Sequence, residues 1–289
     1  MTLRETCDSV RPARPTLKVP LPYAPIVRSF RIGIFCHMFY PDLFGDMRRV
    51  LFNIPKPNDL YLSTCTEDNR ATLGRMFKDW RGKVEVQLVP NRGRDIAPKF
   101  AVFGPAHSSY DLVLHLHTKK NPPGWRDHIL NQIVGSRRIV ESILYAFSEL
   151  PMLGVVAGTH WPPVLPHIHW ASNRDIVDRL IGRMQLRLLV RNLDFPSGSM
   201  FWARPLALTP LLDLRLRPED FPEEAGQSDG TIAHAIERLI FIVCEHQLRD
   251  WLLVSASDRD NPFRPPSVAE LRRVYGATTP SLRRLTWAV

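Results

Sequence analysis

Cysteine is scarce in this chain, and no two cysteines lie close together. There is no C-x-x-C pair, and two of the four cysteines lie in apolar runs, where a free thiol packs as a small apolar side chain; the four are Cys7, Cys36, Cys65 and Cys244. We therefore expect reduced thiols and no structural zinc site.

Long apolar runs are also absent. No run approaches the roughly 18 apolar residues that suggest a membrane-spanning helix. The first residues, MTLRETCDSVRPARP, hold acids and prolines where a signal peptide has an apolar core. The sequence therefore predicts a cytoplasmic protein.

Acidic residues are fewer than basic ones. With 29 Asp and Glu against 38 Lys and Arg, the net charge is +9. Such an excess attracts phosphates, nucleic acid or anionic lipid headgroups without selecting among them, and a generally basic soluble protein explains it equally well. The hydrophobic content of 44% over 289 residues excludes intrinsic disorder of the whole chain.

The middle of the chain alternates short apolar strands with amphipathic helices. The pattern predicts strands over 31–39, 59–65, 83–90, 110–117, 152–160 and 197–204, and helices over 41–54, 67–80, 125–135, 136–150 and 228–248. Crossovers of this length join parallel strands, so we expect a single α/β domain over residues 30–258, with a doubly wound, mostly parallel sheet flanked by helices. Residues 1–29, rich in Pro and Arg, are expected to form an extended arm, and residues 259–289 a basic amphipathic tail.

Ligands of open α/β sheets bind beyond the carboxyl ends of the strands, so the segments that follow strands are the candidate sites. After the third strand the chain continues as NRGRDIAP. In it Gly93 permits a tight turn, Arg92 and Arg94 can pair with phosphate, and Asp95 can accept from ribose hydroxyls. The alternative is a plain turn in which Asp95 caps the next helix and both arginines lie in water.

The fourth strand ends in LHLHTKK. Period-two geometry puts His115 and His117 on one side of the strand, with Thr118 and Lys119 just beyond its end. Two imidazoles on one face can share a metal, but the adjacent lysines would repel a cation and no carboxylate is near in the sequence. We interpret Lys119 as an ammonium aimed at a diphosphate, with His117 as a hydrogen-bond donor beside it. The alternative is a pair of core histidines and solvated lysines.

Two later segments offer small and acidic residues. Ser197, Gly198 and Ser199 precede an aromatic strand, where small residues let a ligand approach the backbone or simply make a turn. Acids are crowded ahead of the last helix, at Glu219, Asp220, Glu223, Glu224 and Asp229. Asp229 is either the N-terminal cap of that helix or, in a basic protein, a general base facing a cationic phosphate site.

Four motifs, NRGRDIAP, LHLHTKK, FPSGSMFWARP and GQSDGTIAHAIERL, occur in this order between Asn91 and Leu239. Together they resemble the rhamnan synthesis protein F family of bacterial polysaccharide assembly. The resemblance implies a GT-A-like glycosyltransferase of polysaccharide or O-antigen assembly, which moves a deoxysugar such as rhamnose from a nucleotide donor, dTDP-rhamnose, to a lipid-linked glycan. An inverting reaction is implied, which needs one general base and no covalent intermediate.

The resemblance also implies roles for particular residues. Ordinary GT-A enzymes hold a divalent metal on the donor diphosphate with an Asp-x-Asp motif after the fourth strand. Here His117, Thr118, Lys119 and Lys120 stand at that place, so we expect no metal and no other cofactor, with cations neutralising the departing diphosphate. Asp229 is the expected base, with Glu223 and Glu224 behind it, and Lys119 and His117 are the other catalytic candidates. The expected substrate contacts are Asn91, Arg92, Gly93, Arg94, Asp95, His115, Thr118, Lys120, Ser197, Gly198, Ser199 and Gln227.

Two other functions fit parts of the sequence. A non-catalytic sugar-binding or nucleotide-binding scaffold would also lack Asp-x-Asp. A nucleic-acid-binding protein would have the same charge, but the arginines are spread along the chain and no recognition motif is visible, so no nucleic-acid partner is expected. In the tail, arginines flank an apolar stripe, which suits a helix in a headgroup layer; peripheral attachment to the inner face of the cytoplasmic membrane is expected, with a helix packed on the domain as the alternative.

Overall fold

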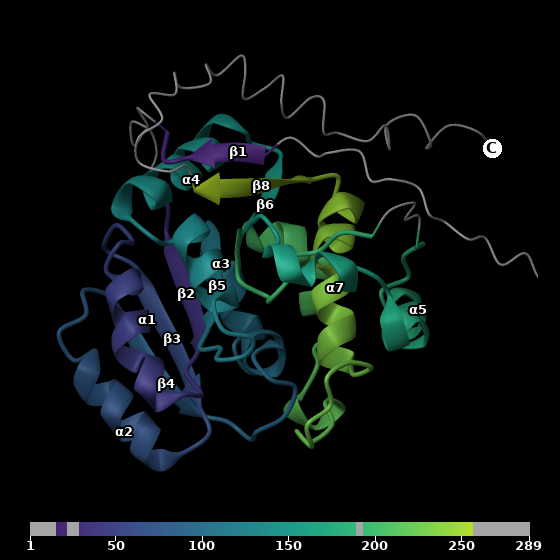
Figure 1. The fold of residues 1–289 in the computed structure, drawn as a ribbon, viewed down its shortest axis with the longest axis horizontal. Coiled ribbons are helices and arrows are strands. Elements are labelled where there is room, and N and C mark those ends of the chain that lie inside the picture. The colour runs from purple at the N-terminus through teal and green to yellow at the C-terminus, as the bar shows by residue number, and fades with distance from the viewer. Residues whose placement is uncertain (1–15, 22–28, 189–192, 257–289) are drawn as a thin grey trace, which may run out of the picture.

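The computed structural model describes residues 16–21, 29–188 and 193–256. Eight strands among these residues form one sheet in the order β1-β8-β6-β7-β5-β2-β3-β4 (Figure 1). Neighbouring strands are parallel, except that β7 runs antiparallel to β5 and β6. The strands are β1 (Thr16–Val19), β2 (Ile32–His37), β3 (Asp59–Thr64), β4 (Val84–Leu88), β5 (Leu112–His117), β6 (Leu153–Gly158), β7 (Phe201–Ala203) and β8 (Asp250–Ala256).

Helices cover both faces of the sheet. One apolar cluster joins one face to α1 (Phe44–Leu51), α2 (Glu67–Met76), α3 (Trp125–Ile133) and α4 (Arg137–Glu149). A second cluster joins the other face to a π-helix (Pro98–Val102), α5 (Arg174–Arg183), α6 (Thr209–Asp213) and α7 (Ile232–His246). In Figure 1 α1 and α2 lie at one side of the view, and α5 and α7 at the other. These layers confirm the predicted α/β, GT-A-like fold with a doubly wound, mostly parallel sheet.

The period of two along β5 decides which layer each side chain meets. Leu112, Leu114 and Leu116 belong to the cluster on the α1–α4 side. His115 instead lies against Phe201, on the face that α7 covers. His117, two residues on, points to the same side, which confirms the expectation that the two histidines share a face.

The reversed direction of β7 matters for the site. Because β7 is antiparallel to its neighbours, the segment that precedes Phe201 lies at the edge where β5 and β6 end. The turn Ser197–Ser199 therefore reaches the same edge as His117. A parallel strand would have carried this turn to the opposite edge of the sheet.

Several elements go beyond the sequence prediction, among them the π-helix and α6. β1 lies within residues 1–29, which were expected to form an extended arm, and pairs with β8, so the sheet continues into that segment. β8 and α5 were not predicted. β1, at one edge of the sheet, has only four residues, which are too few to show the alternation of apolar and polar residues that predicts a strand.

Other expectations concern thiols and the membrane. Cys36, Cys65 and Cys244 are free thiols, as expected, while Cys7 lies outside the described residues. Across residues 16–21, 29–188 and 193–256, none of the helices has the length and apolar character needed to cross a membrane. The predicted tail over 259–289 lies outside the described residues.

Candidate functional site

The four motifs meet at the carboxyl edge of the sheet, on the face that α7 covers. Arg94 of the first motif donates to the backbone oxygen of Gln227 in the fourth, although 133 residues separate them in the chain. His117 Nε2 donates to Gly198 O at 2.8 Å, which joins the second motif to the third. Convergence at this edge is what the topology of an open α/β sheet predicts for a ligand site.

A buried ion pair connects the first motif with the third. Lys99 Nζ donates to Asp95 Oδ2 at 2.7 Å and to Ser199 O at 3.0 Å, and Lys99 is only 1% exposed. Burial alone would raise the pKa of the Asp95 carboxyl, but the charges of His117 and Lys99 hold it below its usual value. The pair fixes the turn Ser197–Ser199 on the π-helix, because a buried charge without its partner would be costly.

His117 is held beside this pair. Its Nδ1 lies 3.8 Å from Asp95 Oδ1, while its Nε2 bonds to Gly198. Burial lowers the pKa of His117 to about 4, despite the opposing effect of Asp95. Near neutral pH the ring is therefore uncharged and donates one hydrogen bond, to the backbone of the turn.

Lys119 is a second lysine of the site. Its Nζ lies 4.0 Å from the centroid of the Trp125 ring. Burial lowers the pKa of Lys119, and the nearby charges of Glu237 and Asp95 oppose that effect, while Arg94 adds to it. The ammonium is thus partly desolvated, which strengthens its interaction with an incoming anion.

Glu237, on the second turn of α7, faces the same turn. Its Oε1 accepts from Gly198 N at 2.7 Å and from Ser199 Oγ at 3.2 Å. Burial raises the pKa of this carboxyl above its usual value. A carboxylate with a raised pKa beside a lysine is a suitable proton acceptor near neutral pH.

The arginines of NRGRDIAP pair with the acidic segment ahead of α7. Arg92 Nη2 lies 2.5 Å from Glu223 Oε1, and Arg94 Nε lies 3.5 Å from Glu224 Oε2. Gly93, with a φ of 62°, lets Phe221 pack against its α-carbon; an added Cβ would lie 2.4 Å from the Phe221 ring. Glu223 and Glu224, the next candidates for the base after Asp229, are thus engaged in ion pairs with the two arginines.

The sequence that carries these four motifs is similar to known proteins. A family model described as Rhamnan synthesis protein F matches residues 19–248. The chain belongs to the rhamnan synthesis protein F family. Two relatives from Xanthomonas campestris pv. campestris, strains B100 and ATCC 33913, each named "Uncharacterized protein WxcX", are 42% identical over 221 residues. The match covers 74% of this chain and 31% of each relative, so the chain spans about a third of their length.

Membership of the rhamnan synthesis protein F family links the chain to rhamnan and polysaccharide synthesis. The model of the family covers all four motifs, from Asn91 to Leu239. Each motif also contributes a side chain or a backbone group to the contacts described above. The family match therefore includes all the motif residues that meet at this edge of the sheet.

Some predicted site residues of this family member serve the fold instead. His115 was expected to bind substrate, but it is 0% exposed and its Nε2 shares a hydrogen bond of 2.9 Å with His107 Nε2, so a ligand cannot reach it. Thr118 Oγ1 accepts from Phe39 N at 2.9 Å and from Tyr40 N at 3.1 Å, and thus holds the loop after β2.

Asp229 is also engaged by the fold. Its Oδ1 accepts from Asn173 Nδ2 at 2.7 Å and pairs with Arg238 Nη2 at 3.2 Å, and its Oδ2 accepts from Ser172 N. Burial acts to raise the pKa of Asp229, but the Asn173 hydrogen bond and the Arg238 charge hold it below its usual value. Thr231, not Asp229, is the N-cap residue of α7.

The remaining predicted contacts lie at the rim. Lys120 is exposed and pairs with Asp42 at 2.8 Å. Asn91 is exposed, and its backbone oxygen accepts from Glu224 N. The side chain of Gln227 bonds to Ala225 N and Glu223 O, within the acidic segment.

Sequence reasoning missed two central residues, Lys99 and Glu237. Both lie inside the quoted motifs or just after them, where helical spacing was available as a signal: Lys99 follows Asp95 by four residues, so the pair shares a helical face. Glu237 stands among the buried residues of α7, and a carboxylate in such surroundings is a candidate for function.

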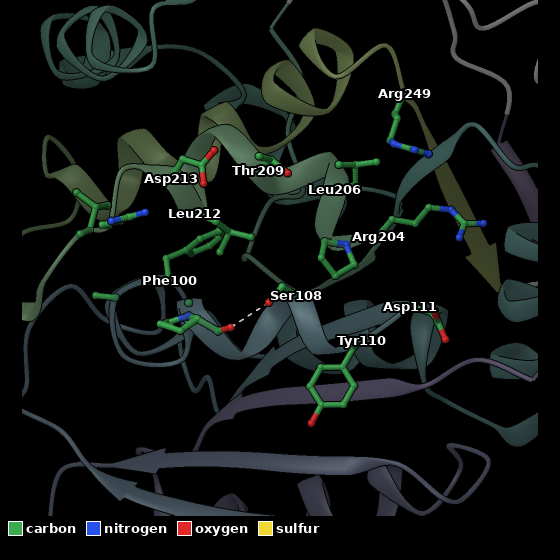
Figure 2. A pocket seen from close by; sticks show the side chains of 16 residues that line it. Phe100, Ser108, Tyr110, Asp111, Arg204, Leu206, Thr209, Leu212, Asp213 and Arg249 are labelled. Atoms are coloured by element: carbon green, nitrogen blue, oxygen red, sulfur yellow. Dashed lines mark hydrogen bonds between the residues drawn. The ribbon is translucent and has the colours of Figure 1, made fainter.

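Among the described residues, neither a group able to hold a metal nor the cavity of Figure 2 lies at this edge. Within the described ranges, no group of three or more His, Cys, Asp or Glu residues could hold a metal ion. A cavity of about 950 Å³ opens instead at the other edge, where β5 begins and β7 ends. Figure 2 shows Phe100, Tyr110, Arg204 and Leu212 around it. None of the contacts between the four motifs described above lies in this cavity.

Proposed function

We propose that this chain is a glycosyltransferase of polysaccharide or O-antigen assembly. It transfers a deoxysugar such as rhamnose from a nucleotide donor, dTDP-rhamnose, to a lipid-linked glycan. The reaction inverts the anomeric centre and needs no divalent metal or other cofactor. A lipid-linked acceptor would be met in the cytoplasm, at the inner face of the cytoplasmic membrane. Membership of the rhamnan synthesis protein F family supports the class of reaction.

The observation that carries this proposal is the partly desolvated Lys119. It stands just beyond the end of β5, beside Trp125 and within range of the charges of Glu237, Asp95 and Arg94. An ammonium here stabilises the negative charge that grows on a departing diphosphate, and a fixed cation in a partly dry site does so without reorganisation. His117 contributes by holding the turn that faces the ammonium.

The other residues take roles that follow from their positions. Arg94, with Arg92 and Asn91 at the rim, contacts the nucleotide. The turn Ser197–Ser199 contacts the sugar. Glu237 acts as general base, because its pKa is raised and its Oε1 accepts a hydrogen bond from the backbone of this turn. Asp229 is the second candidate for that role.

Inversion requires a single displacement. The acceptor hydroxyl loses its proton to the base as its oxygen forms the new glycosidic bond. The bond between the anomeric carbon and the diphosphate oxygen breaks in the same step, and its electron pair leaves with the diphosphate beside Lys119. One carboxylate to take the proton and one cation to stabilise the leaving diphosphate suffice for this chemistry.

A catalytically inactive scaffold of the same fold is the alternative. It would bind the nucleotide sugar through the same groups without turning it over. The deciding experiment incubates the full chain with dTDP-rhamnose, GDP- and UDP-sugars and a lipid-linked acceptor, and follows both the melting temperature and transfer. Stabilisation without transfer or donor hydrolysis supports the scaffold.

The same assay tests metal independence. We expect transfer to continue in excess EDTA at the rate measured without it, because Lys119 takes the place of the ion. A complete loss that manganese or magnesium restores would contradict this. Lys78→Ala, at an exposed lysine after α2, is the matched reference for lysine variants.

A further inference from the structure

Ser197 is linked to two residues that the sequence analysis did not identify. Its Oγ lies 2.9 Å from His160 Nδ1, and His160 Nε2 lies 2.9 Å from Asp194 Oδ1. The side chains of His160 and Asp194 are only 8% and 12% exposed, and Ser197 is 7% exposed. His160 follows β6, while Asp194 and Ser197 precede β7, so three loop residues form one nearly buried chain of hydrogen bonds.

The direction of each hydrogen bond in this chain is determined by its last member. Asp194 Oδ1 can only accept when ionised, and it also accepts from Phe195 N at 2.8 Å. His160 Nε2 must therefore carry the proton, which leaves Nδ1 as an acceptor in the neutral ring. The hydroxyl of Ser197 then donates to Nδ1. Its oxygen lone pairs remain for a donor that comes from outside the chain.

The same three residue types form the nucleophilic triad of many hydrolases, but the surroundings differ here. Such a nucleophile needs backbone N–H groups to stabilise an oxyanion. In this turn Gly198 N donates to Glu237 at 2.7 Å and Ser199 N donates to Pro196 O at 2.9 Å. Both N–H groups that follow Ser197 are therefore occupied, and the turn offers no oxyanion hole.

Ser197 belongs to the turn that collects the other site contacts. Gly198 lies against the Trp125 indole, since an added Cβ would be 3.5 Å from two of its ring atoms. Gly198 O accepts from His117, and Ser199 O accepts from Lys99. A ligand that reaches Lys119, whose ammonium stands over the same indole, therefore also meets this turn.

We propose that His160, held by Asp194, is a positioning residue that makes Ser197 an acceptor for a sugar hydroxyl of the substrate. This inference rests on the proposed function and deepens it. The site selects a sugar whose hydroxyl donates a hydrogen bond to Ser197 Oγ. A sugar that carries hydrogen or an ether oxygen there loses the bond. The contact selects the sugar, while the nucleotide is held elsewhere.

The first measurement is independent of activity. Long-range ¹H–¹⁵N correlation spectra of the full chain at pH 7.5, with His160→Gln to assign the signal, should show His160 as the Nε2–H tautomer. The Nδ1–H tautomer would overturn the proposal, because Ser197 would then accept from His160.

Binding measurements by calorimetry use dTDP-rhamnose and dTDP as probes. Ser197→Ala should weaken binding of dTDP-rhamnose about fivefold to tenfold, the effect of one lost hydrogen bond, and leave dTDP binding unchanged. His160→Phe, whose ring fills the same space but accepts nothing from Ser197, should weaken binding of the sugar nucleotide in the same way. The double variant should be no weaker than Ser197→Ala, because the two residues act as one unit.

The outcomes separate the two proposals. Ser108→Ala, an exposed serine at the opposite edge of the sheet, is the control and should bind as the parent chain does. If the parent chain binds neither probe, the proposed function fails and this inference fails with it. If the parent chain binds dTDP-rhamnose but Ser197→Ala binds it equally well, or the two variants add fully, only the inference fails. Should Ser197→Ala melt early, His160→Phe alone gives the same decision.

Discussion

The ammonium group of Lys119 stands at a position where burial opposes its charge. Removing it takes away an electrostatic stabiliser rather than a structural contact, because its described neighbour is the face of an indole ring. Lys119→Ala should lower the turnover number at least a hundredfold, by analogy with a lost oxyanion donor, which costs about 2.7–4 kcal/mol. Steady-state transfer assays with Lys78→Ala alongside measure this. A parental rate in Lys119→Ala would mean that the lysine is only solvated.

Two carboxylates compete for the role of base, and one pair of isosteric variants distinguishes them. Glu237→Gln should reduce transfer by two orders of magnitude or more, because the amide cannot take a proton, while its oxygen still accepts from Gly198. Asp229→Asn loses the ion pair with Arg238, which should lower the free energy of unfolding by about 1–3 kcal/mol and leave turnover largely intact. A folded but inactive Asp229→Asn would restore the assignment that the sequence alone predicts.

For individual residues of the site, the motifs predicted correctly only those next to the ends of strands. Lys119 and His117 follow directly from the end of β5, and Ser197–Ser199 from a run of small residues. Glu237 and Lys99 become visible only when α7 and the π-helix are packed against the turn, since their charges are buried by residues 38 and 100 positions away. His115 shows the converse: a polar residue at a strand end that aromatic neighbours take into the core.

At the scale of elements, the loop 91–95 and the acidic segment ahead of α7 form one unit. Arg92 and Glu223 also form an isolated antiparallel bridge through their backbones. The close contact of Gly93 with Phe221 requires both a left-handed φ and the absence of a Cβ. The sequence predicted the turn at Gly93, but its partner could not be predicted, because no local pattern links residue 93 to residue 221.

Gly93→Ala should therefore be strongly destabilising. The positive φ and the clash with Phe221 together should lower the free energy of unfolding by about 1–3 kcal/mol or more. Gly74→Ala, in α2, where an added Cβ meets nothing within 4 Å, should instead raise it by up to about 1 kcal/mol. Urea denaturation of the two variants checks both signs. A neutral Gly93→Ala would show that the acidic segment does not depend on this contact.

Element types were predicted well where the apolar period was long, as in α4 and α7, whose bounds differ from the predicted ranges by a few residues. β1 and β8 were not, for different reasons. Four residues carry too little periodicity, and a strand at the end of the domain is recognised only through its neighbour in the sheet.

At the scale of the whole molecule, buried histidines make stability depend on pH. Burial lowers the pKa of His107 and His117 to about 4 and that of His37 to about 3. Between roughly pH 6.5 and these values the unfolded chain binds protons that the folded chain does not, so stability falls as pH falls. Each such group contributes up to about 1.4 kcal/mol per pH unit.

The urea midpoint should therefore decrease steadily between pH 7 and pH 5. The Asp95 carboxyl, whose pKa is held low, adds a further loss only at more acidic pH, below the unfolded value of about 3.9. Circular dichroism at each pH, before urea is added, verifies a native starting state. An unchanged midpoint over this range would mean that the histidines of the folded chain take up protons as readily as those of the unfolded chain.

The pairing of β1 with β8 also orders events in time. Thr16 lies beside Leu253, so β1 can pair within the sheet only after β8 has been made. During synthesis from the N-terminus, β1 emerges more than two hundred residues before its partner, at a translation rate of about 5–20 residues per second. Among the described strands, β8 is made last and joins β1 to the sheet, and the segments that form the site are in place only once α7 has been released.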